Sequence, residues 1–204
     1  MANLTRGGFW PEHNQGATAT QTKRVRVASG NGTAIFLGDC LTRTAAGVWG
    51  LATAGGANAV SGISQGASFQ DTTQLVRKEG VFLPASTTYS STAFDTYGET
   101  DQSFIYIVAD PLSVRYVVER NAGAAALTDL TKNASFIANA GSTTTGISGH
   151  KIDDTTIATT AALAFSIMDF KHNVLNDMTI AAGDYVVQIN ILSVPPVAAG
   201  AAGN

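Results

Sequence analysis

The chain is poor in charge and in long apolar runs, and each shortage excludes a class of protein. Charged residues make up 13% of its 204 residues, against about 25% in ordinary globular domains. The formal net charge of −3 argues against direct binding of nucleic acid, because phosphate backbones favour clustered lysine and arginine. No apolar run could cross a bilayer, and the first residues lack a secretion signal. We therefore expect a protein made in the cytoplasm, with no membrane partner.

Cysteine is nearly absent, because Cys40 is the only one. A single cysteine can form no disulfide within the chain. Cys40 lies where a predicted strand runs into a turn, and no base stands close to it in the sequence. We interpret it as a small buried apolar side chain rather than as a reactive thiol.

Histidine is scarce as well, and its spacing predicts no metal site. His13, His150 and His172 form neither an HxH nor an HxxxH pattern. We predict that each is a solvated loop residue. Gly38 and Asp39 lack the glycine spacing and the lysine of a phosphate-binding loop. The sequence therefore predicts no cofactor.

Paired carboxylates are the one pattern that suggests hydrolysis. Asp153 and Asp154, with Asp169, could in principle cleave a glycosidic bond. Acidic pairs in a polar link beside Lys151 are more often turn and cap residues. We therefore predict no catalytic residue and a protein that is not an enzyme.

What the chain does contain is short bursts of β-forming residues, separated by Gly, Ser, Thr, Ala and Asn. Such bursts, bounded by turn residues, predict strands. They lie at residues 20–27, 33–37, 104–108, 114–119, 162–168 and 185–192. The fold class that this predicts is mainly β, in a compact β-barrel or β-tulip-like domain.

Three local patterns refine this prediction. The turn Ser29-Gly30-Asn31-Gly32 predicts a hairpin that pairs residues 20–27 with 33–37. The glycine-rich stretch 47–69 predicts small strands that bend sharply in a barrel. Leu127, Leu130 and Ala134 recur at helical spacing, which predicts one short helix.

The chain divides into an arm, a body and a tail. Residues 1–19 are too rich in glycine to pack alone, and we expect an extended N-terminal arm. Residues 20–194 form the β-rich body, within which 71–102 is a long excursion. Residues 195–204 begin with two prolines, and we expect them to form a flexible tail.

The arm and the long excursion carry the candidate interaction residues. Large aromatic side chains make good anchors in a partner's pocket. Residues 1–28 carry a net charge of +3 and the remainder −6, so basic side chains near the arm would face an acidic partner. The candidates are Phe9, Trp10, Arg6, Lys23, Arg24 and Arg26 for the arm, and Tyr89, Phe94 and Tyr97 for a candidate interaction loop.

Several segments follow one another in a recognisable order: VRVASGNGTAIFLGDCLTR, the glycine-rich turns after it, VADPLSVRYVVE, TDLTKNASFIANAGSTTTGISGHKID and YVVQINILSV. This order resembles that of tailed-bacteriophage proteins that decorate, or cement, the capsid. The resemblance covers most of residues 24–194 and rests on segment order and on the turn residues between segments. The excursion at 71–102 has no counterpart in this family.

The resemblance implies a structural role rather than a chemical one. It implies a virion protein on the capsid exterior, made in the host cytoplasm, that bridges neighbouring major capsid protein subunits. Closed symmetry favours a small homo-oligomer, and we expect a homotrimer rather than a dimer.

Two alternatives to the cement function follow from the same sequence. The first is a head-fibre base or carbohydrate-binding β module that recognises a host surface. Its sugar-stacking residues would be Trp49, Tyr89, Tyr97 and Tyr106, although aromatic residues in strands more often belong to a core. The second alternative is a stand-alone hydrolase that depends on Asp153 or Asp169.

Overall fold

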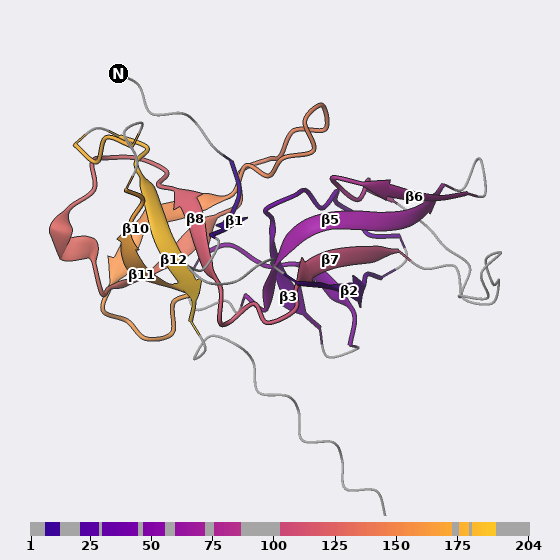
Figure 1. Cartoon of the computed structure of the whole chain (residues 1–204), viewed down its shortest axis with the longest axis horizontal. Coiled ribbons are helices and arrows are strands. Elements are labelled where there is room, and N and C mark those ends of the chain that lie inside the picture. Colours follow the sequence, from indigo (N-terminus) through magenta and orange to yellow (C-terminus); the bar gives the residue numbers. More distant parts are fainter. Residues whose placement is uncertain are drawn as a thin grey trace, which may run out of the picture.

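The chain folds into two antiparallel sheets that lie at opposite ends of one elongated body (Figure 1). The computed structural model describes residues 7–12, 21–28, 30–44, 47–55, 60–71, 76–86, 103–172, 176–179 and 181–190, without the side chains of 70, 71 and 76. The predicted fold class, mainly β, is confirmed.

The first sheet has six strands in the order β1-β8-β12-β11-β9-β10. Arg120 and Asn121 follow β8, and the Asn121 N–H donates to the carbonyl of Ile152 in β10 at 2.9 Å. The sheet therefore curls, and its last strand approaches its second at a single bridge. Its strands are β1 (Trp10–Pro11), β8 (Arg115–Glu119), β9 (Asn133–Ile137), β10 (Lys151–Ala158), β11 (Phe165–Phe170) and β12 (Asp184–Ile189).

The second sheet also has six strands, in the order β2-β7-β5-β3-β4, with β6 beside β5. Its strands are β2 (Thr22–Arg26), β3 (Cys40–Arg43), β4 (Trp49–Leu51), β5 (Gly62–Asp71), β6 (Val76–Gly80) and β7 (Phe104–Val108). In β7, Ile105 and Ile107 are buried while Phe104 and Tyr106 are half-buried. This alternation gives the sheet one core face and one outward face.

The two sheets share a hydrophobic core. The larger cluster of buried side chains joins Cys40 and Ile63 of the second sheet to Tyr116 and Phe165 of the first. A smaller cluster lies under the second sheet and includes Val25, with Ile105 and Ile107 from β7.

The predicted closed barrel is not found among the described residues. In each sheet the two ends approach each other only at a single bridge, Arg120 with Ile152 and Val27 with Trp49, rather than along a ladder. The glycine-rich stretch 47–69 contains one small strand, β4, and most of the ten-residue strand β5. Gly66 takes a φ of +131°, a conformation that favours glycine. It lies where the pairing of β5 with β7 shifts register between Ser64 and Ala67. The glycine therefore permits a bulge inside one long strand rather than a turn between two.

The predicted hairpin around residues 29–32 is wrong. β2 pairs with β7, which lies almost eighty positions further along the chain, and residues 33–37 form no strand. Instead Ile35 and Leu37 make isolated bridges to Leu83 and Ile147. The turn signal was local, whereas burial of Ile35 in the smaller cluster depends on distant residues.

The predicted helix is also wrong, because only a 3-10 turn forms, at Leu127–Asp129. The Asp129 carboxylate accepts the Ala126 N–H at 3.0 Å and the Tyr185 hydroxyl at 2.8 Å, which holds the turn against β12. Thr131 then adopts a φ of +66°, which ends helical geometry. Leu127 is 78% exposed, and Ala134 lies in β9.

The expected extended arm is wrong for residues 7–12, which belong to the body. Trp10 pairs with Val117 of β8, and the Gly8 N–H donates to the His150 carbonyl at 3.0 Å. Phe9 is fully buried and stacks on Phe165. Residues 1–6 and 13–20 and the tail at 195–204 lie outside the described residues.

Candidate functional site

The outward side of β2, β7, β5 and β6 gathers arginine and aromatic side chains, and it is the candidate interaction surface. Val25 is buried, so Arg24 and Arg26 on either side of it point outward. Arg24 lies opposite Tyr106 and Arg26 opposite Phe104 in the β2–β7 pairing. We call this surface the arginine–aromatic face, and it consists of Arg24, Arg26, Ser68, Arg77, Glu79, Phe104 and Tyr106.

Two arginines lie over the ring of Phe104 at the centre of this face. The guanidinium carbon of Arg24 is 5.0 Å from the ring centroid, and that of Arg77 is 5.4 Å away. Arg77 also donates to the Ser68 hydroxyl at 3.2 Å. A cation over an aromatic ring contributes about 0.5–1 kcal/mol at an exposed site. These contacts order long side chains before any partner arrives.

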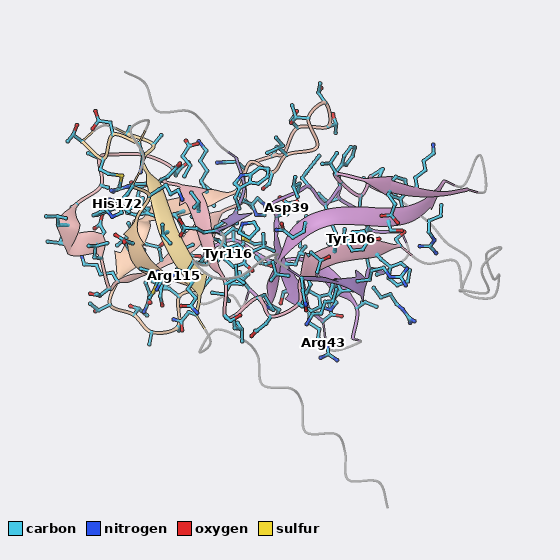
Figure 2. The ribbon with its side chains drawn as sticks, viewed as in Figure 1. Asp39, Arg43, Tyr106, Arg115, Tyr116 and His172 are labelled. Carbon is cyan, nitrogen blue, oxygen red and sulfur yellow. The ribbon has the colours of Figure 1, made fainter. Side chains whose placement is uncertain are left out.

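Tyr106 extends the face toward β6. Its hydroxyl donates to Glu79 Oε1 at 3.0 Å. Partial burial raises the pKa of Tyr106 above its ordinary value, and the hydrogen bond to Glu79 raises it further. The phenol therefore stays protonated at neutral pH. Figure 2 labels Tyr106 on the second sheet.

The face is positive although the chain as a whole is negative. Among the residues of the face that the structure describes there are three arginines and one carboxylate, Glu79, while the net charge of the chain is −3. Lys23 is exposed on the same edge strand, β2. Within the described residues β2 pairs with β7, and Val27, which follows β2, bridges Trp49 of β4.

The structure places only part of the predicted site here. Lys23, Arg24 and Arg26 are exposed on β2 as a basic group. Sequence reasoning missed Arg77 and Phe104 as their neighbours, because the pairings of β2 with β7 and of β6 with β5 are not encoded in any local pattern. Arg6, Tyr89, Phe94 and Tyr97 lie outside the described residues.

The aromatic pair of the predicted arm takes two different places. Phe9 was expected to anchor in a partner, and that prediction is wrong because the ring fills the chain's own core. Trp10 is half-buried, at the edge of the first sheet. The sequence showed two adjacent aromatic residues, and only the fold distinguishes them.

A buried cluster of Asp39, Cys40 and His150 lies between the sheets. His150 is 4% exposed, so the expectation of a solvated loop residue is wrong. Its Nδ1 accepts the Cys40 N–H at 3.2 Å, and its Nε2 lies 3.4 Å from Asp39 Oδ1. Burial lowers the pKa of His150, opposed by the charge of Asp39, and burial raises the pKa of Asp39.

These contacts hold together two segments that are distant in the sequence, one with Asp39 and Cys40 and the other with His150. Both ring nitrogens of His150 already have partners within the chain, so neither faces a substrate. Cys40 is fully buried, as the sequence predicted, and burial raises the pKa of its thiol well above the usual value. A buried thiol of this kind is a poor nucleophile.

The acidic residues that suggested hydrolysis are engaged in local structure. Asp153 lies in β10 rather than in a turn, and its Oδ1 accepts the Thr155 N–H at 3.1 Å. Asp154 lies 3.7 Å from an Arg120 nitrogen. Asp169 accepts the N–H of the next residue at 2.8 Å and lies 3.4 Å from the exposed His172.

Two features are absent from the described part of the chain. It contains no group of three or more His, Cys, Asp or Glu side chains that could hold a metal ion. It also contains no helix with the length and apolar character needed to cross a membrane.

Comparison with known proteins gives no match. No protein-family model matches it, and no curated protein or solved structure matches it either. A functional assignment therefore depends on the residues of this chain.

Proposed function

We propose that this chain is a structural virion protein that binds the outer surface of an icosahedral phage capsid and cements neighbouring major capsid protein subunits. The observation that carries the proposal is the arginine–aromatic face. It is a surface rich in arginine, with side chains ordered by contacts over Phe104, and it suits an acidic protein partner.

The composition of the face supports a protein contact. Arginine and tyrosine are enriched among the residues that dominate binding energy, and aromatic residues and arginine are enriched in interfaces relative to the rest of the surface. Arg24 and Arg77 already lie over Phe104, so part of the entropy of fixing their side chains is lost before binding. An acidic shell surface would gain charge-assisted hydrogen bonds from all three arginines.

Repetition on a symmetric shell makes modest contacts effective. A ligand that binds one state of an assembly stabilises that state by mass action. We propose a homotrimer, favoured over a homodimer, as the form that occupies a symmetry axis. The finer description of the body as β-tulip-like belongs to this proposal as well.

The test measures attachment to purified capsids of the phage whose genome encodes the chain. Arg24→Glu with Arg26→Glu reverses two charges on the face, and we expect at least a tenfold weaker co-sedimentation. Arg43→Glu with Arg115→Glu makes the same charge change at exposed positions outside the face (Figure 2). We expect this control to bind like the wild type. Equal loss in both variants, or in neither, would contradict the proposal.

A further inference from the structure

A cavity of about 560 Å³ opens beside Trp10, away from the arginine–aromatic face. One wall comes from the start of the chain and the other from the loop between β9 and β10. The lining residues in the described part of the chain are Gly7, Trp10, Ala140, Ser142, Thr145, Ile147 and Ser148.

The wall that carries Trp10 is held rigidly. The indole Nε1 donates to the Gly7 carbonyl at 2.8 Å. A Cβ atom at Gly7 would lie 1.9 Å from the Ser148 carbonyl oxygen, so only glycine permits this close approach. Phe9, which precedes Trp10, is fully buried. Trp10 is therefore held by the burial of Phe9 and by its own hydrogen bond to Gly7, and it remains half-buried at the cavity.

The opposite wall is a tight turn whose hydroxyl groups are oriented by the backbone. The Ser142 N–H donates to the Ile147 carbonyl at 2.9 Å, which closes the turn. The Ser142 hydroxyl oxygen accepts the Thr145 N–H at 3.3 Å, and the Thr145 hydroxyl oxygen accepts the Ile147 N–H at 3.4 Å. A hydroxyl that accepts in this way still has its own hydrogen to donate.

The chemistry of the two walls selects a ligand class. None of the described lining residues is charged, so a charged ligand would meet no counter-charge. An indole ring offers a flat apolar surface, and the hydroxyls offer donors. A sugar ring has an apolar face of C–H groups and hydroxyl oxygens at its rim. The cavity volume lies within the range of about 300–1,000 Å³ that is typical of small-molecule sites.

We propose that this cavity binds a neutral saccharide, with the sugar ring against Trp10 and its hydroxyl oxygens accepting from Ser142 and Thr145. The inference is independent of the capsid proposal, because the residues belong to another part of the molecule. The two sites would let one chain attach to a protein surface and bind a glycan.

The experiment begins with an array of neutral and acidic glycans, probed with the full chain. The best neutral oligosaccharide is then titrated by tryptophan fluorescence in a Trp49→Phe background, where Trp10 is the only tryptophan. We expect Trp10→Ala to abolish binding when probed on the array. Thr145→Val should weaken binding about tenfold, since it removes one hydrogen bond. Thr144→Val, an exposed neighbour outside the lining, should bind like the parent.

Several results would overturn the inference. They are no binding of any neutral glycan, binding of acidic glycans alone, or equal affinity of Thr145→Val and Thr144→Val. If circular dichroism shows that Trp10→Ala unfolds, the two threonine variants decide. Capsid co-sedimentation of Thr145→Val should be unchanged, so the two proposals can fail separately.

Discussion

Truncation of Phe9 should cost a large part of the stability of the whole domain. The ring is fully buried and lies 4.5 Å from that of Phe165, with 16° between their planes. Replacing a buried phenylalanine by alanine removes its transfer free energy and leaves a cavity, at a cost of about 3–5 kcal/mol. A domain is stable by about 5–15 kcal/mol in total. We therefore expect Phe9→Ala to lower the free energy of unfolding by about 4 kcal/mol.

The assay is urea denaturation followed by circular dichroism, with calorimetry as a second measurement. For a chain of about this length, each kcal/mol shifts the melting temperature by about 2–4 °C, so the expected decrease is about 8–16 °C. Leu127→Ala is the control, because that side chain is 78% exposed and should cost less than about 0.5 kcal/mol. A loss of unfolding free energy below about 1 kcal/mol for Phe9→Ala would refute the reasoning. It would indicate instead that Phe9 lies in an extended arm outside the core.

Two further predictions concern the close contact of Gly7 and the buried side chain of His150. Gly7→Ala should cost about 1–3 kcal/mol in urea denaturation, because its Cβ would meet the Ser148 carbonyl, while Gly32→Ala, with open space at its Cβ, should change little. The lowered pKa of His150 means that the unfolded chain binds more protons below about pH 6.5. Stability should therefore fall from about pH 7.5 to about 5.5 more steeply in the wild type than in His150→Gln, and parallel curves would contradict this.

The sequence predicted the strands that carry dense apolar runs. Phe104–Val108 is a strand at the predicted residues, and 114–119 differs from β8 by one residue. Both segments contain enough buried β-branched residues for the local sequence alone to predict a strand. β10 was missed, because its KIDDTTIA sequence is polar and is only partly buried at an end strand. Its pairing with β9, rather than its composition, makes it a strand.

The candidate site was predictable only in part, for the same reason. Arg24 and Arg26 were singled out from charge, but their meeting with Phe104 and Arg77 depends on β2 pairing with β7 and on β6 pairing with β5. No local pattern encodes such long-range pairing. His150 was misjudged because its glycine-rich surroundings resemble a loop, whereas its burial comes from residues 7–9 and 38–40.

Cryo-electron microscopy of intact particles tests the central claim most directly. The virions should come from the phage that encodes the chain, without added protein. We predict density for the two-sheet body outside the shell, with Arg24, Arg26 and Arg77 against acidic residues of the major capsid protein. Particles that lack this density, or that hold the body through another surface, would contradict the account.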